Sequence, residues 1–181
     1  MVLKVPLCGD GAVGKTALRL RYMGKGFQSR YMMTIGADFA IKDVQVSRGK
    51  FAGEIHKVQI WDLAGQVSFS VVRPLYYAGS HGALLAFDCT RPSSLDNIPN
   101  WVAEILRGVG KKIPIVLIAN KIDLRRQTEV AISAEEGREM ARQISDEYFE
   151  GRLKVPYYET SAKSGENVEE AFEKIVELGL S

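Results

Sequence analysis

The segment at residues 9–16 limits the possible folds of this chain more than any other, because it matches the pattern G-x-x-x-x-G-K-[ST]. It consists of Gly9, Asp10, Gly11, Ala12, Val13, Gly14, Lys15 and Thr16. A strand-like apolar stretch at 2–8 precedes it and a helical pattern at 15–23 follows, as the pattern requires. Glycines let backbone N–H groups turn inward toward phosphate oxygens, and the N-terminus of a helix favours negative charge. The segment predicts a phosphate-binding loop.

Two side chains of this loop have expected roles. Lys15 is expected to reach the β- and γ-phosphates of a nucleotide, and the Thr16 hydroxyl is expected to bind Mg²⁺. Kinases and motor ATPases use a loop of the same pattern, so the loop alone leaves both the base and the reaction open.

The rest of the chain alternates between strand-like and helix-like segments. Further strands are expected at 39–46, 57–62, 82–88, 113–120 and 155–160, and further helices at 67–77, 94–107, 134–149 and 168–178. The strands at 83–87 and 115–119 are apolar at nearly every position, which is typical of a mostly parallel sheet covered by helices on both faces. This pattern predicts an α/β fold. Pro6 conflicts with it locally, because a central strand needs the N–H that proline lacks.

In such a fold, ligands bind beyond the carboxyl ends of the strands. The segments 9–16, 62–66, 120–123 and 161–163 each follow directly on an expected strand. We therefore expect these four segments to meet at one edge of the sheet.

Composition excludes several classes of function. The 181 residues are 46% apolar and 25% charged with a net charge of +2, so no nucleic-acid partner is expected. Cys8 and Cys89 lie in apolar runs and are expected to be reduced core residues, and His56 and His81 lack the spacing of zinc ligands. No signal peptide or membrane-spanning stretch is apparent, so a cytoplasmic protein is expected.

The segment 120–123 carries a second pattern, N-K-x-D, formed by Asn120, Lys121 and Asp123. A carboxylate at Asp123 can accept hydrogen bonds from both N1–H and N2–H₂ of guanine, whereas adenine lacks this pair of donors. Asn120 can tie this segment to the phosphate-binding loop, and the stem of Lys121 can lie over the base. Alone the pattern is weak, and a surface turn is the commoner interpretation, but after a phosphate-binding loop it predicts guanine.

Together these motifs resemble those of the Ras-superfamily small GTPases, closest in pattern to the Rab branch, with a phosphate-binding loop similar to that of the Rho branch. The resemblance implies one GTP-binding domain over 1–181, with the P-loop NTPase fold. That fold is a mostly parallel six-stranded sheet with one antiparallel strand and helices on both faces. It also implies further nucleotide contacts at Ala17, Phe27, Tyr31, Ser161, Ala162 and Lys163, with the Ala162 N–H facing guanine O6. For Phe27, an ordinary apolar contact is the alternative.

The resemblance further implies two switch loops that respond to the γ-phosphate. Thr34 in the first loop would bind Mg²⁺ and the γ-phosphate. In the second loop, Asp62 would hold Mg²⁺, the Gly65 N–H would contact the γ-phosphate, and Gln66 would orient the attacking water. Gln66, Lys15 and Thr34 are thus the expected catalytic residues. Arg30 as an internal arginine finger is an alternative to an activating partner, although a solvated loop arginine is the simpler interpretation.

Expected partners are effectors, exchange factors and GTPase-activating proteins. The resemblance places them at the switch loops and at Phe39, Trp61 and Tyr76, although aromatic residues that merely cover the sheet are the alternative. Leu63 and Val67 depart from the Rab pattern and predict altered recognition by these partners. Met33 stands where the family commonly has proline and predicts a more mobile first switch loop. Trp101 is expected to be an ordinary packing residue. The segments 47–53 and 144–154 are longer than in the usual core and have no assigned function.

The sequence thus predicts a monomeric GTP switch that hydrolyses GTP slowly. A module that holds GTP or GDP without turnover is the alternative, and a P-loop kinase would need an acceptor site and a lid that the motifs do not provide. Residues 178–181 contain no cysteine, so membrane contact is expected only if a lipidated tail is missing.

Overall fold

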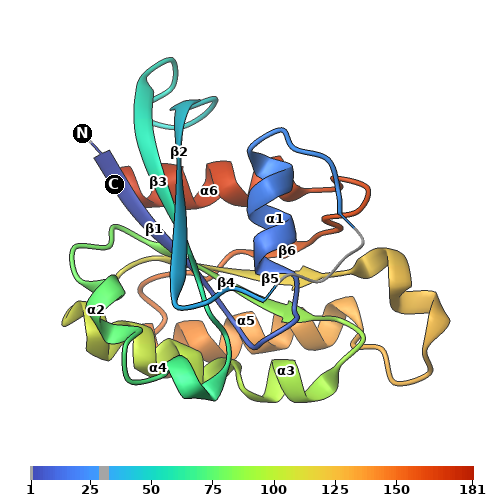
Figure 1. Ribbon diagram of the computed structural model, residues 1–181. Coiled ribbons are helices and arrows are strands. Elements are labelled where there is room, and N and C mark those ends of the chain that lie inside the picture. Colours follow the sequence, from blue (N-terminus) through green and yellow to red (C-terminus); the bar gives the residue numbers. More distant parts are fainter. Residues whose placement is uncertain (1, 29–32) are drawn as a thin grey trace.

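The computed structural model describes residues 2–28 and 33–181 of the chain. Its centre is a sheet with the strand order β2-β3-β1-β4-β5-β6 (Figure 1). The strands are β1 (Val2–Cys8), β2 (Ala37–Gln45), β3 (Ile55–Leu63), β4 (Ala83–Asp88), β5 (Ile115–Asn120) and β6 (Tyr157–Glu159). β2 runs antiparallel to β3, and the other neighbouring pairs are parallel. The predicted α/β class and the single antiparallel strand are confirmed.

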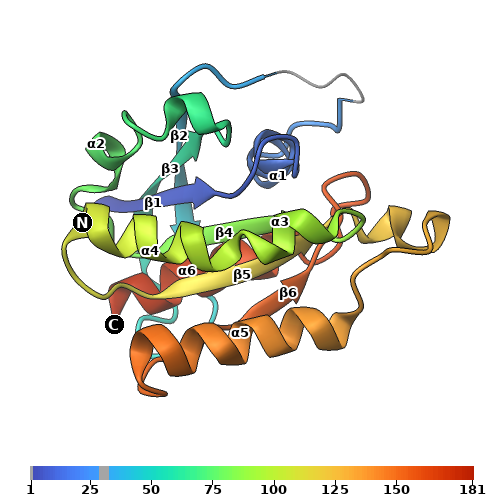
Figure 2. The ribbon, with the colours of Figure 1, turned by 90° about the horizontal axis from the view of Figure 1, so that it is seen from below.

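Helices cover both faces of this sheet (Figures 1 and 2). They are α1 (Lys15–Tyr22), α2 (Pro74–Tyr77), α3 (Pro92–Asp96), α4 (Ile98–Val109), α5 (Ala134–Phe149) and α6 (Val168–Leu180), with short 3₁₀ helices η1 (Val67–Phe69) and η2 (Ile122–Gln127). α4 and α5 bury Val102, Ile105 and Ile144 on one face, while α1 and α6 bury Leu18 and Phe172 on the other. Among the described helices, none is long and apolar enough to cross a bilayer.

Two predicted helices differ from the structure. The single helix expected at 67–77 is wrong, because η1 and α2 are separate there, and the helix expected at 94–107 is divided into α3 and α4 at Asn97. Proline explains both breaks. In a continuous helix Pro74 and Pro99 could not donate to the carbonyls four residues earlier, whereas near the start of a new helix no such donor is needed.

The conflict at Pro6 is resolved by the pairing of β1. Register with β3 continues through Pro6, opposite Trp61, but the ladder with β4 begins only at Leu7. Alternate residues of a strand direct their backbone N–H groups to the same side, so the nitrogen of Pro6 faces the β4 side, as that of Lys4 does. There the Lys4 N–H donates to Nδ1 of His81 at 3.1 Å. Pro6 therefore occupies a position where no ladder donor is required.

The hairpin expected around 47–53 is present between β2 and β3. The Val46 N–H donates to the Glu54 carbonyl at 2.9 Å, and the Gly53 N–H donates to the Val46 carbonyl at 2.8 Å. The Ser47 hydroxyl donates to Glu173 of α6 at 2.9 Å. The tip of the hairpin therefore rests on α6, on the face opposite α4 and α5.

Candidate functional site

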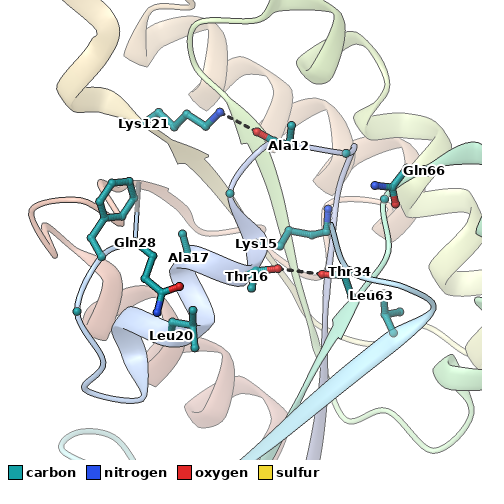
Figure 3. Close-up of a pocket in the computed structure, with 15 residues that line it drawn as sticks. Ala12, Lys15, Thr16, Ala17, Leu20, Gln28, Thr34, Leu63, Gln66 and Lys121 are labelled. Carbon is teal, nitrogen blue, oxygen red and sulfur yellow. Dashed lines mark hydrogen bonds between the residues drawn. The ribbon is translucent and has the colours of Figure 1, made fainter. Parts of the chain in front are cut away.

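The loops that follow β1, β3 and β5 meet at one edge of the sheet, as predicted, around the N-terminus of α1 (Figure 3). The loop after β6 joins them through hydrogen bonds to Asn120 and Asp123. A cavity of about 190 Å³ lies between the loops after β1, β3 and β5 and the segment after α1. Its lining includes Gly11, Ala12, Gly14, Lys15, Thr16, Ala17, Phe27, Thr34, Gly65, Gln66 and Lys121. Leu63 of the second switch segment also lines it, as do Leu20 and Gln28, to which no motif pointed.

The phosphate-binding loop is held against the loop after β5. Gly14 adopts φ = 99°, and a Cβ atom there would lie 2.4 Å from Nδ2 of Asn120, so only glycine fits. Asn120 Nδ2 donates to the Val13 carbonyl at 3.0 Å, and Lys121 Nζ donates to the Ala12 carbonyl at 2.7 Å. The predicted tie between Asn120 and the phosphate-binding loop is therefore present in the structure.

Lys15 is buried at the centre of the site. Its ammonium group donates to the carbonyls of Gly9 and Asp10 at 2.7 and 2.8 Å. Burial lowers the pKa of Lys15 to about 8, against the opposing charge of Asp62. Burial removes water from the ammonium group, and two carbonyl oxygens replace only part of its solvation. An anionic ligand beside it would therefore stabilise the charged form of Lys15.

Thr16, Thr34 and Asp62, predicted as metal ligands from three separate segments, converge. The Thr16 hydroxyl lies 3.0 Å from the Thr34 hydroxyl (Figure 3). The Thr16 hydroxyl also lies 2.5 Å from Oδ2 of Asp62, and the Thr34 hydroxyl lies 3.4 Å from the same oxygen. Asp62 is fully buried, and its Oδ1 has no hydrogen-bond partner within the described part of the chain. Burial raises the pKa of Asp62, which the Thr16 hydrogen bond and the charges of Lys15 and Arg19 oppose. Such a set of oxygen donors fits Mg²⁺.

The segment with Gly65 and Gln66 packs directly on the phosphate-binding loop. A Cβ atom at Gly65 would lie 2.4 Å from the Gly9 carbonyl oxygen, so any side chain would push the two loops apart. The Gln66 side chain lies beside Gly11, within 3.7 Å of the position a Cβ atom would take there. Both residues therefore line the cavity next to the loop that carries Lys15.

The residues predicted to read the base form a second group. The Ser161 hydroxyl donates to Oδ1 of Asp123 at 2.7 Å and fixes the orientation of that carboxylate. The Ala162 N–H, expected to face guanine O6, donates to Oδ1 of Asn120 at 3.2 Å. Arg21 of α1 donates to the carbonyls of Ala162 and Lys163. The motifs do not point to Arg21, whose two hydrogen bonds connect α1 to this loop.

Tyr31, expected to contact the nucleotide, and Arg30, considered as an internal arginine finger, lie outside the described residues. Lys163, also expected at the nucleotide, is exposed.

Trp101 does more than the predicted packing. It is buried, but its indole N–H donates to Oδ1 of Asp10 in the phosphate-binding loop at 2.7 Å. The guanidinium of Arg73 lies 4.3 Å from the Trp101 ring centroid and donates to the carbonyls of Ala64 and Gln66 at 3.2 and 2.9 Å. Trp101 and Arg73 thus connect the phosphate-binding loop with the segment that carries Gly65 and Gln66.

Arg73 is in turn held by α4. Its Nε and Nη2 donate to the two carboxylate oxygens of Glu104 at 2.7 and 2.8 Å, and the Tyr77 hydroxyl donates to the same carboxylate at 2.7 Å. Burial opposes ionisation of Glu104, but the hydrogen bonds from Arg73 and Tyr77 outweigh it and lower its pKa. A forked arginine contact of this kind fixes orientation as well as charge.

Phe39, Trp61 and Tyr76 form one continuous aromatic cluster. Ring centroids lie 4.9 Å apart for Phe39 and Trp61 and 5.6 Å apart for Trp61 and Tyr76. Leu63, one of the predicted departures from the Rab pattern, is fully buried, so it cannot alter recognition through surface contact. Val67 is 85% exposed and can do so.

Comparison with known proteins agrees with these motifs. The sequence model of the Ras family matches residues 4–180. The chain is 36% identical to the Ras-related protein Rab7 of Drosophila melanogaster, over 99% of this chain and 81% of that protein. It is 36% identical to the Ras-related protein Rab-13 of Rattus norvegicus, over 96% of this chain and 78% of that protein. Identity to the Ras-related protein RABD2c of Arabidopsis thaliana is 38%, over 94% and 77%.

Proposed function

The chain belongs to the Ras family of small GTPases, with relatives in the Rab branch, and from this premise we propose that it is a guanine-nucleotide switch. GTPase activity follows from membership of the family. The proposal adds that residues 1–181 form one GTP-binding domain. This domain holds GTP or GDP with Mg²⁺ and displays the bound nucleotide through the loops around Thr34 and Gln66.

The observation that carries the proposal is the convergence of Thr16, Thr34 and Asp62 beside the buried ammonium of Lys15. A nucleotide phosphate would pair with Lys15, and the three oxygen donors would hold Mg²⁺, directly or through water. The bound ion would neutralise charge on the β- and γ-phosphates. Because Thr34 comes from a separate loop, a bound γ-phosphate and metal would hold that loop in place, and their loss would allow it to move.

Guanine is the base that this chain's residues favour. Ser161 holds the Asp123 carboxylate ready to accept from N1–H and N2–H₂ of guanine. Adenine would leave that carboxylate unpaired, which costs binding free energy. Asn120 and Lys121 join this group to the phosphate-binding loop, so base and phosphates would be bound by one connected structure.

For hydrolysis, we assign Gln66 to orienting the attacking water and the Gly65 N–H to contacting the γ-phosphate. The position of both residues against the phosphate-binding loop supports this assignment. Without an activating partner, turnover is expected to be slow, on the order of 10⁻⁴ s⁻¹. Effectors and regulators would bind the switch loops and the cluster of Phe39, Trp61 and Tyr76, and the Rab relatives suggest a role in vesicle traffic.

Two measurements test the proposal. First, the purified protein is denatured and the released nucleotide identified; GDP or GTP is expected, and adenine nucleotide would refute the assignment of Asp123. Second, single-turnover hydrolysis is compared between the wild type and Gln66→Leu, which keeps the bulk of the side chain. A loss of at least about tenfold is expected. An unchanged rate would show that Gln66 is not catalytic and would favour a module that holds nucleotide without turnover.

A further inference from the structure

Arg19 is a buried cation of α1 that the nucleotide assignments above do not use. Its side chain is 10% exposed and points toward the Mg²⁺ ligands rather than to solvent. Nη2 forms an ion pair with Oδ2 of Asp38 at 2.6 Å, and Nε lies 3.8 Å from Oδ2 of Asp62. The guanidinium thus lies between an exposed carboxylate of β2 and the buried carboxylate at the proposed metal position.

The two contacts of Arg19 differ in kind. The Asp38 side chain is 61% exposed, so water already solvates much of its charge. Asp62 is fully buried, and no described residue accepts a hydrogen bond from the buried Nε of Arg19. Since arginine stays protonated in proteins, Asp62 permanently faces a second cation in addition to Lys15. At this separation and burial, water screens the interaction only weakly.

We propose that Arg19 is a positioning residue that acts as a fixed counter-charge for Asp62 and reduces the dependence of nucleotide retention on Mg²⁺. This inference rests on the proposed function. Arg19 acts through Asp62 and is not assigned a contact with nucleotide or metal.

Arg19 weakens the link between Mg²⁺ and nucleotide both when Mg²⁺ is bound and when it is absent. When Mg²⁺ is bound, the positive charge of Arg19 opposes it and weakens its binding. When Mg²⁺ is absent, Arg19 still balances Asp62, so the carboxylate repels the nearby phosphates less. Because Mg²⁺ and nucleotide binding are linked, both effects reduce the coupling between them. Removing the charge of Arg19 should therefore strengthen this coupling.

Asp38 explains why the guanidinium stays at this position. It lies at the start of β2, four residues after Thr34, and its carboxylate anchors Nη2 while Nε remains directed at Asp62. The length of the arginine side chain spans both carboxylates. An apolar residue in place of Arg19 would remove one of the two cations, Lys15 and Arg19, whose charges favour the ionised form of Asp62.

The test measures release of fluorescently labelled GDP from the intact chain across a titration of free Mg²⁺. The readout is the ratio of the release rate in EDTA to that in saturating Mg²⁺, together with the Mg²⁺ midpoint. Arg19→Met is expected to raise the ratio about tenfold and to lower the midpoint. Arg19→Gln removes the charge but keeps a polar N–H donor near the position of Nε, so it should show the same shift even if the methionine variant folds poorly.

Three further proteins complete the design. Arg19→Lys keeps the charge and should stay within about twofold of the wild-type ratio, as should Asp38→Asn, which leaves the arginine facing Asp62. Arg142→Met is the matched control, because Arg142 is an exposed arginine of α5 that pairs with Glu135 and Glu139. Thermal unfolding gives an independent readout: the neutral variants should lose stability in EDTA and regain it in Mg²⁺.

The outcomes separate the two proposals. Wild-type protein that does not retain guanine nucleotide, or whose release is independent of Mg²⁺, contradicts the proposed function. If the wild type depends on Mg²⁺ but Arg19→Gln has the same ratio and midpoint, the role of Arg19 is refuted while the function stands. An effect of Asp38→Asn as large as that of Arg19→Gln would also refute it, since the contact with Asp62 would then not be the cause.

Discussion

Replacing Arg73 with methionine tests whether the segment around Gln66 is held in place from α4. Methionine fills the space of the arginine stem but removes every hydrogen bond of the guanidinium. Those bonds reach both oxygens of Glu104 and the carbonyls of Ala64 and Gln66. The change therefore leaves a carboxylate without its cation and two carbonyls without donors.

The magnitude follows from the burial of the two partners. Breaking a buried ion pair on one side costs about 3–5 kcal/mol. The Arg73 side chain is almost fully buried, but Glu104 keeps 24% of its exposure and can be partly solvated, so we expect the lower end, about 3 kcal/mol. For a domain of this size that loss lowers the unfolding temperature by roughly 6–12 °C. Because the carbonyl of Gln66 is released, hydrolysis should also slow by about tenfold.

The assay is denaturant unfolding of the GDP-bound protein, with Arg142→Met as the surface control that should change stability by less than about 0.5 kcal/mol. A loss below about 1 kcal/mol for Arg73→Met would refute the reasoning. The pH dependence gives a second check. The folded pKa of Glu104 lies below its unfolded value, so its stabilising contribution is present at neutral pH and is lost as pH falls through the folded pKa. The difference between wild type and Arg73→Met should therefore shrink in acid.

Three further predictions concern single contacts. Ser161→Ala removes the donor that orients the Asp123 carboxylate and should weaken GDP binding about tenfold in a fluorescence titration, whereas unchanged affinity would mean that Asp123 needs no such support. Gly14→Ala places a Cβ atom against Asn120 and should abolish nucleotide retention, measured as nucleotide content after gel filtration; full occupancy would contradict the close approach of the two loops. Burial raises the pKa of Cys8 to about 12, so its thiol should resist alkylation at pH 8 until the protein unfolds. Mass spectrometry follows the labelling, and rapid labelling of the folded protein would show that Cys8 is accessible.

Much of the fold was predictable from the sequence because its signals are local. Residues 83–87 and 115–119 of two central strands are apolar at every position. The helix at 134–149 begins with a capping box in which Ser133 and Glu136 bond to each other's backbone N–H. The predicted helices failed where a proline broke a helical pattern, at Pro74 and Pro99. There apolar periodicity suggested continuity that the backbone cannot provide.

The site was predictable where its residues belong to short motifs and unpredictable where they act from a distance. Asn120 and Thr16 stand within recognisable patterns. Arg73 and Trp101 belong to no motif, and their role arises because folding brings α4 beside the second switch segment. The role of Arg19 was also unpredictable from a motif, because its partners Asp38 and Asp62 lie 19 and 43 residues away in sequence. The pairing of β2 with β3 brings these two carboxylates opposite each other.

Different contacts hold the two switch segments in place, so we expect one segment to stay ordered more than the other when the γ-phosphate leaves. The segment around Gly65 packs against the phosphate-binding loop at a distance that only glycine allows, and Arg73 fixes the carbonyls on both sides of it. Both restraints come from the protein itself and would persist when the γ-phosphate leaves. Thr34 is held by its hydroxyl contacts to Thr16 and Asp62, the groups proposed to bind Mg²⁺. Loss of the γ-phosphate should therefore release the segment around Thr34 more readily than the segment around Gly65.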